Sequence, residues 1–104
     1  MSILMNFAIF PTDKGSSVSE YVSKVIKMID ETGFSYKLTA MGTIVETDDL
    51  QKALDLIYKA QEILKQYSNR IYCTTTFDIR YDKPLGRMDS KINSVEQKIG
   101  KINK

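Results

Sequence analysis

Several polar side chains occur where the sequence otherwise has strand-like or helix-like apolar runs, and these could bind a ligand. Glu46 ends a run of β-forming residues that begins at Thr43, and Asp78 and Arg80 lie in the alternating segment 72–81. A carboxylate can hold a cationic or amine-bearing molecule through both charge and hydrogen bonds. Two simpler interpretations stay open. Asp78 and Arg80 could pair with each other or across a subunit interface, and Glu46 could be a solvated strand end.

Two amide side chains interrupt apolar patterns. Gln61 lies between Ile57 and Leu64 on the apolar stripe of a predicted helix, and Asn6 lies in the first predicted strand. A buried amide without a partner would cost about 1–3 kcal/mol. We therefore expect a buried backbone group or a ligand to satisfy Gln61. Phe10 could stack on a planar ring, although aromatic side chains in strands more often only pack.

The composition disfavours conventional catalysis. The chain has no histidine, so it has no His-based acid–base system and no His-ligated metal. The single cysteine, Cys73, cannot form a thiolate cluster, and its place on the apolar face of segment 72–81 predicts that it packs in the core. No glycine-rich phosphate fingerprint is present. We expect a binding protein rather than an enzyme, with no metal and no cofactor.

The segment 72–81 has the period-2 pattern of a strand with one dry face and one polar face. The apolar set is Cys73, Thr75, Phe77, Ile79 and Tyr81, and the polar set is Tyr72, Thr74, Thr76, Asp78 and Arg80. Residues 3–10 are nearly all apolar and suit a central strand. Residues 36–41 and 43–46 predict two short strands separated by a turn or bulge at Gly42.

Helical spacing predicts three helices. The first has a capping box from Ser17 to Glu20 and stops at Gly33. The second opens with a similar signal over residues 48–51. Its predicted apolar face is Leu50, Ala53, Leu54, Ile57, Gln61 and Leu64. The last is an amphipathic segment with Met88, Ile92, Val95, Ile99 and Ile102 on one side.

The predicted order is β-α-β-β-α-β followed by a C-terminal helix, in one domain spanning residues 1–104. Right-handed crossovers then give an α+β, ferredoxin-like sandwich, with a four-stranded antiparallel sheet and two helices on one face. The other face of such a small sheet is commonly covered by a second copy of the chain. We therefore expect a homo-oligomer.

The charge and the hydropathy of the chain bear on its binding partners and on its location in the cell. The net charge of +2 is too small to indicate nucleic-acid binding, although residues 83–104 carry six basic against two acidic side chains. The most economical interpretation is that these lysines form the wet side of the last helix. Residues 1–7 show neither a basic leader nor a long apolar run, and there is one cysteine. We expect a cytoplasmic protein without a membrane partner.

Four segments together resemble the small thiamine-binding proteins of the YkoF-like superfamily, in its short single-domain form. They are Phe7–Asp13, Met41–Glu46, Thr75–Arg80, and Lys91 with Ser94–Glu96, and the resemblance extends from about residue 6 to 96. Two positions depart from the pattern of the short family. Thr47 stands where glycine often follows the Glu46 motif, and Gln61 stands where a histidine would be expected.

The resemblance implies a ferredoxin-like subunit, a dimer or tetramer built through its sheets, and non-catalytic binding of thiamine or its hydroxymethylpyrimidine moiety. A pocket for thiamine needs a carboxylate for the cationic thiazolium, hydrogen-bonding groups for the aminopyrimidine, and an apolar or aromatic wall. The residues offered for these roles are Glu46, Thr43, Asn6, Phe10, Thr12, Gln61 and Asp78. Glu46 and Thr43 are the first choices, because they lie in the best-matching motif.

A different class of function remains open beside this one. The protein could be a structural or regulatory interaction module that docks another protein through its open sheet face or its basic final helix. Complete burial of the face of Thr74, Thr76, Asp78 and Arg80 in a homo-oligomer would leave only the helix for docking. Nucleic-acid binding through residues 83–104 is a distant third, and it would weaken steeply with salt.

Overall fold

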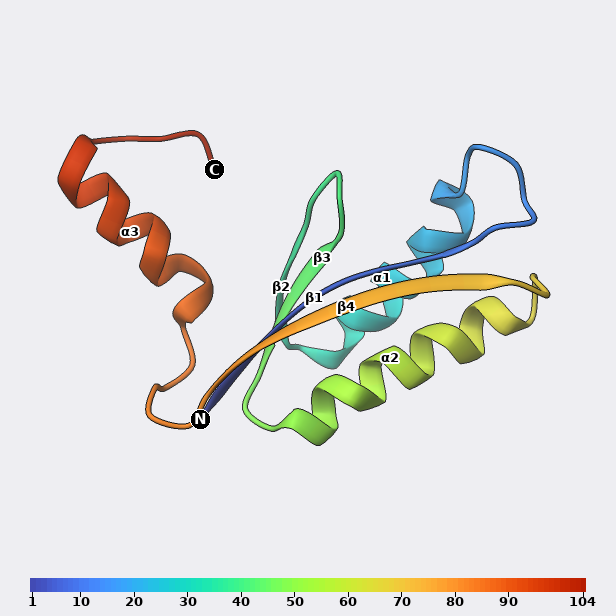
Figure 1. Ribbon diagram of the computed structural model, residues 1–104, viewed down its shortest axis with the longest axis horizontal. Helices are drawn as coiled ribbons and strands as arrows, with labels where there is room; N and C mark the ends of the chain where they lie inside the picture. The colour runs from blue at the N-terminus through green and yellow to red at the C-terminus, as the bar shows by residue number, and fades with distance from the viewer.

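The computed structural model describes all 104 residues and has the predicted order of elements (Figure 1). The strands are β1 (Ser2–Pro11), β2 (Ser35–Leu38), β3 (Thr43–Thr47) and β4 (Ile71–Arg80). The helices are α1 (Ser19–Thr32), α2 (Leu50–Lys65) and α3 (Arg87–Ile99). The strands form one antiparallel sheet in the order β2-β3-β1-β4. This is the arrangement that the two split crossovers predict, so the ferredoxin-like α+β class is confirmed.

One face of the sheet carries the core. Alternate residues of β1 point to this side, and α1 and α2 cover it with buried apolar residues of their own. The buried cluster consists of Ile3, Met5, Phe7, Ile9, Val25, Ile29, Val45, Ala53, Leu56, Ala60 and Leu64. The opposite face, called here the open face, contains Asn6 together with its register partners Ile44 and Thr76. The predicted division of β4 into two faces is therefore confirmed, and β1 is the predicted central strand.

Local signals predict the ends of the helices with mixed success. Gly33 ends α1 with a left-handed φ of 80°, as predicted for a glycine stop. Asp49 precedes α2, and its carboxylate accepts a hydrogen bond from the backbone N–H of Gln51. The capping box predicted at Ser17 is wrong. The first N–H groups of α1 donate to the carbonyl of Val18, so the helix begins later, and no side chain caps it.

The predicted apolar face of α2 is also partly wrong. The buried residues are Ala53, Leu56, Ala60 and Leu64, whereas Leu54 is 41 % exposed. Apolar residues occupy more than half of the circumference of this helix, so two overlapping apolar stripes could each face the sheet. The stripe with two alanines lies against the sheet, because small side chains let the helix approach the strands closely.

Cys73 does not pack in the core, contrary to the prediction. It lies on the helix side of the sheet, opposite Ile9, but its side chain is exposed. The reason is that β4 is an edge strand, and only part of it lies under α2. Phe77, two positions away from the half-buried Thr75 and Ile79, is likewise 38 % exposed. Alternation identifies the face of a strand but not its distance from the centre of the core.

Helix α3 stands apart from this two-layer body (Figure 1). None of its residues is buried, and it makes few contacts with β1. The molecule measures 46 × 29 × 21 Å, and its radius of gyration is 15.1 Å. A compact domain of this length would have a radius of gyration of about 13 Å. None of the helices combines the length and apolar character that a membrane crossing requires.

The corrected face of α2 can be tested with two substitutions in the same helix. Leu56→Ala should lower the free energy of unfolding by about 2–4 kcal/mol, because Leu56 is 2 % exposed and its loss leaves a cavity. Leu54→Ala should cost less than about 1 kcal/mol, because its side chain is already partly in water. Urea denaturation followed by circular dichroism measures both. Equal losses would contradict the assignment.

Candidate functional site

A cavity lies where β1 extends beyond its neighbour β3. Pairing between these strands ends at Phe7 and Thr43, whereas β1 continues to Pro11. The chain from Thr39 to Gly42 turns away at this point and forms the tip of the β2–β3 hairpin. The space between this tip, β1 and the first half of α1 is a cavity of about 220 Å³.

The wall of the cavity is mainly apolar and contains no charged residue. Val22 and Ile26 line it from α1, Leu38 from the hairpin, and Phe10 from β1. Thr43 is 5 % exposed and brings a hydroxyl-bearing side chain to the wall. Ligand sites in proteins commonly combine such an apolar wall with a few polar groups that fix orientation. The cavity suits an uncharged, planar, partly polar molecule.

Gly42 allows the hairpin tip to approach β1 closely. A Cβ atom at this position would lie 3.0 Å from the backbone carbonyl oxygen of Phe7 and 3.0 Å from Oδ1 of Asn6. The turn is held by Thr39, whose hydroxyl accepts hydrogen bonds from the backbone N–H groups of Met41 and Gly42. The predicted break at Gly42 is therefore a close approach of two backbones, and it closes one side of the cavity.

Two of the proposed ligand residues lie at the margins of the cavity. Asn6 faces a separate hollow of about 140 Å³ on the open face, which shares Phe7, Ala8 and Met41 with the cavity wall. Thr12 lies in a depression that also contains Phe10. The hydroxyl of Thr12 donates a hydrogen bond to the carbonyl of Arg70, at the start of β4. Thr43, Phe10 and Thr12 thus lie toward one end of the sheet, and Asn6 lies nearer its middle.

Glu46 lies at the other end of β3, and the residue is 4 % exposed. It accepts a 2.5 Å hydrogen bond from the hydroxyl of Ser2, and further bonds from the backbone N–H groups of Gly86 and Arg87. These two N–H groups belong to the start of α3, where the helix leaves N–H groups without internal partners. Glu46 therefore caps α3 from a distant strand, and the helix dipole favours its negative charge.

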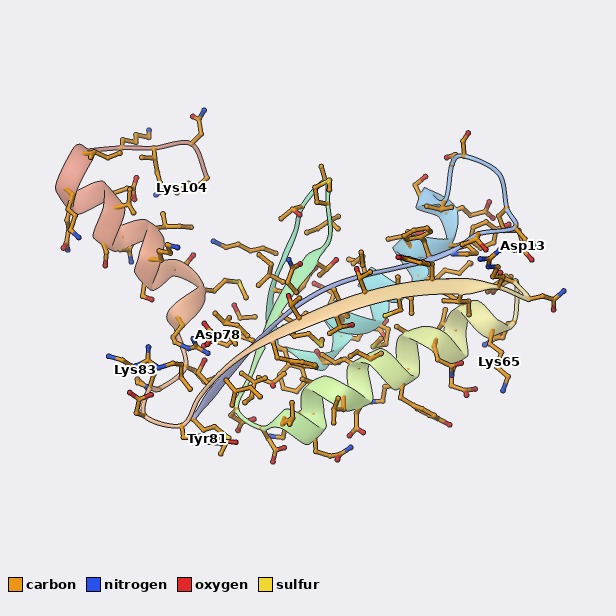
Figure 2. The ribbon with its side chains drawn as sticks, in the orientation of Figure 1. Asp13, Lys65, Asp78, Tyr81, Lys83 and Lys104 are labelled. Carbon is orange, nitrogen blue, oxygen red and sulfur yellow. The ribbon has the colours of Figure 1, made fainter.

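Arg87 completes this cluster, which we call the clamp (Ser2, Glu46, Asp78 and Arg87). Its guanidinium donates hydrogen bonds to the hydroxyl and carbonyl oxygens of Ser2 and to the carbonyl of Asp78, and it forms a 3.1 Å ion pair with the Asp78 carboxylate. Figure 2 labels Asp78 beside the base of α3, and Asp13, which follows Thr12 in the chain, at the far end of the sheet. The clamp and the cavity are therefore separate sites.

The clamp holds Glu46 in its ionised form. Burial raises the pKa of the Glu46 carboxyl, but hydrogen bonds from Ser2 and from the backbone at Gly86, Arg87 and Met88 outweigh it, so that the pKa lies below its ordinary value. A buried carboxylate is tolerated only when its oxygens find such partners. Here the partners come from the chain itself.

The polar side chains of Gln61 and Arg80 also find their hydrogen-bond partners within the chain. The amide nitrogen of Gln61 donates to the carbonyl of Tyr58 and to the carboxylate of Glu62 on the same helix, and Gln61 is not among the residues that line the cavity. Asp78 and Arg80, one of the open alternatives, do not pair with each other within the chain. Arg80 forms an ion pair with Asp82, because the turn after β4 brings that carboxylate to its guanidinium. No group of three His, Cys, Asp or Glu side chains is placed to hold a metal ion.

Sequence reasoning missed the residues that complete both sites. Ser2 and Arg87 are 85 positions apart, and no local pattern connects them. The sequence pattern indicates only core or surface positions for three apolar residues of the cavity wall, Val22, Ile26 and Leu38. A weak signal for the clamp existed in Gly86, which precedes an amphipathic segment that lacks a capping side chain of its own.

The lowered pKa of Glu46 predicts how stability depends on pH. The carboxyl has a lower pKa folded than unfolded, so its ionisation stabilises the protein above about pH 4.5, the ordinary value, and this contribution is lost as the pH falls through the folded-state pKa. Glu46→Gln should therefore lower the melting temperature at pH 7, and the difference from the wild type should shrink below pH 4.5. Glu31→Gln, an exposed carboxyl on α1, is the control. A pH-independent difference would contradict the clamp.

The sequence of this chain is similar to a family model and to several known proteins. The family model described as thiamine-binding protein matches residues 5–96. A UPF0045 protein of Methanothermobacter thermautotrophicus is 33 % identical over 85 residues, which cover 81 % of this chain and 85 % of that protein. A UPF0045 protein of Synechocystis is 31 % identical over 98 residues, with coverage of 92 % and 78 %.

Solved structures show the same fold. A hypothetical protein of Methanocaldococcus jannaschii superposes with a TM-score of 0.76 at 28 % identity, covering 97 % of this chain and 98 % of that one. A candidate thiamine biosynthesis/salvage protein of Thermotoga maritima superposes with a TM-score of 0.78 at 16 % identity, covering 91 % and 99 %. The second likeness shows the fold alone. Because the family match spans nearly all of the sheet and both covering helices, this chain belongs to the thiamine-binding protein family.

Proposed function

We propose that the protein binds thiamine or its hydroxymethylpyrimidine moiety, without chemical conversion, in the cavity between α1 and the β2–β3 hairpin. One observation carries the proposal: an uncharged and mainly apolar cavity lies entirely within the residues that match the thiamine-binding family. The name of the Thermotoga maritima protein, which refers to thiamine biosynthesis or salvage, agrees with this assignment. Salvage, transport and sensing are all compatible with binding alone.

The chemistry of the cavity favours the pyrimidine half of the ligand. The aminopyrimidine is neutral and planar, and it has donors and acceptors along one edge, so an aromatic wall at Phe10 and a hydroxyl at Thr43 fit it. The thiazolium is a permanent cation, and the wall offers it no carboxylate. Glu46 and Asp78 lie in the clamp at the other end of the sheet. We therefore place the pyrimidine inside and the thiazolium at the mouth.

The remaining members of the site have supporting roles in this proposal. Asn6 lies behind the hairpin tip, where it can fix the position of Gly42 or receive a part of the ligand that reaches the open face. Thr12 borders the cavity beyond Phe10 and is anchored to Arg70. Met41 is 89 % exposed at the hairpin tip, so it can fold over a bound ring.

Isothermal titration with the two halves of thiamine tests the placement. Thiamine and hydroxymethylpyrimidine should both bind saturably, with affinities within about tenfold of each other, because the same contacts hold the pyrimidine in both. Hydroxyethylthiazole alone should give no saturable heat. If none of the three compounds binds at millimolar concentration, the proposed function is wrong. If thiamine and the thiazole bind but hydroxymethylpyrimidine does not, the binding of thiamine stands and the placement is wrong.

Thr43 provides a matched test of the site itself. Thr43→Val keeps the shape of the side chain and removes the hydroxyl, so we expect about a tenfold loss of affinity for hydroxymethylpyrimidine, the value of one hydrogen bond. Ser94→Ala also removes a hydroxyl, but from an exposed position on α3 outside the cavity and the hollow at Asn6, and should leave the affinity unchanged. The melting temperatures of both variants serve as a check on folding. Equal affinity for Thr43→Val and the wild type would remove this residue from the site.

A further inference from the structure

The edge of β1 beside the cavity has no partner strand. Pairing with β3 ends at Phe7, whereas β1 continues through Ile9, which is 5 % exposed and lines the cavity. If the ladder continued, its register would set Met41 opposite Ile9. Met41 instead belongs to the hairpin tip, where its backbone N–H donates to the hydroxyl of Thr39. The space opposite Ile9 is therefore part of the cavity.

The direction of the backbone at Ile9 follows from the alternation of an antiparallel ladder, in which successive residues turn their N–H and C=O groups to opposite neighbours. The N–H of Thr12 donates to the carbonyl of Arg70, so the even-numbered residues of β1 face β4. The carbonyl oxygen of Phe7 lies beside Gly42, so the odd-numbered residues face the side of β3. The N–H and C=O of Ile9 therefore point toward the cavity. None of the backbone hydrogen bonds outside the helices and strands involves them.

Pro11, the next odd-numbered residue of β1, agrees with an open edge on this side. Proline has no N–H, and within a sheet it is tolerated where its nitrogen faces no partner strand. Between Phe7 and the end of β1, Ile9 thus supplies the one backbone N–H on the cavity side, with its own carbonyl beside it. Buried backbone groups without partners are rare, because each costs about as much as a lost hydrogen bond. A ligand in the cavity can satisfy both groups at once.

We infer that the backbone of Ile9 selects the ligand, by accepting a ring with an acceptor next to a donor, such as a 4-aminopyrimidine, and rejecting a 4-oxopyrimidine. This role rests on the proposed function and names the group that recognises the pyrimidine. Ring N3 accepts from the N–H of Ile9, and the 4-amino group donates to its carbonyl, as a partner residue does in a hydrogen-bonded antiparallel pair. A 4-oxopyrimidine carries a hydrogen on N3 and an oxygen at position 4. It sets donor against donor and acceptor against acceptor.

The side chains of the cavity wall cannot make this distinction. The hydroxyl of Thr43 is both a donor and an acceptor, and it rotates to suit either partner. The other wall residues named above, Phe10, Val22, Ile26 and Leu38, offer no polar side-chain group. The backbone of Ile9 has a fixed donor and a fixed acceptor, and the β1–β4 ladder holds them in place. Discrimination between the two rings therefore comes from the strand edge, whereas Thr43 adds affinity for both.

Titration of the wild-type protein with hydroxymethylpyrimidine and with its 4-oxo analogue measures the discrimination. The 4-oxo analogue should bind about 100-fold more weakly, because two polar pairs are mismatched in a site that water cannot freely enter. Equal affinities would overturn the role of Ile9 and leave the proposed function standing. If hydroxymethylpyrimidine itself does not bind, the proposed function fails and the role of Ile9 fails with it.

Replacement of Ile9 by its α-hydroxy acid assigns the discrimination to the backbone. The ester that results removes the N–H and keeps the side chain, so affinity for hydroxymethylpyrimidine should fall about tenfold and the preference over the 4-oxo analogue should shrink by a similar factor. The same replacement at Ile79 is the matched control. Ile79 pairs with Ile3, an odd-numbered residue of β1, so its N–H faces the outer edge of β4, away from the cavity.

The control variant should keep both the affinity and the preference, and melting temperatures of the two esters show that both are folded. Thr43→Val should weaken both ligands alike and leave their ratio unchanged. An unaltered ratio in the ester at position 9 would overturn the role of Ile9, as would equal losses at positions 9 and 79. A ratio that collapses in Thr43→Val instead would assign the selection to the hydroxyl and overturn it too.

Discussion

The buried carboxylate of Glu46 is the constraint on which the arrangement of the outer parts of this molecule depends. A charge with so little exposure needs donors on all sides, and they come from the first residues of β1 and of α3. Satisfying this one group ties together Ser2, Glu46 and Arg87, which are far apart in the chain. It anchors the start of the central strand and fixes the direction in which the last helix leaves the body.

The opposite end of the sheet is governed by unequal strand lengths. β1 has ten residues and β3 has five, so the last residues of β1 have a neighbouring strand on one side only. In many sheets such a gap would be filled by a large side chain. Here the hairpin tip folds beside it through the close approach at Gly42, and α1 closes the other side, which leaves an apolar cavity. The clamp thus lies at one end of the sheet and the cavity at the other.

Three errors of the sequence interpretation share one origin. The alternation in β4 predicted the two faces correctly, but Cys73 is exposed because β4 is an edge strand. The spacing in α2 predicted a helix, but the sheet contacts a stripe rotated toward Leu56 and Ala60. Glu46 was recognised as an exceptional residue, yet its partners within the chain could not be foreseen. In each case the local pattern was read correctly, and the missing information was the identity of the neighbour in space.

The sequence by itself determined the order of the elements, the faces of the long strands, the stop at Gly33 and the fold class, because period, turn residues and crossover handedness are local or topological constraints. It also singled out Thr43 and Phe10, which the fold brings to one cavity. Only the tertiary structure decided that Glu46 and Asp78 belong to a clamp with Ser2 and Arg87, and that no residue of α3 is buried. The physical reason is that hydrogen bonds to a buried charge, and the exposure of a helix face, are properties of residues distant in the chain that meet only in the folded molecule.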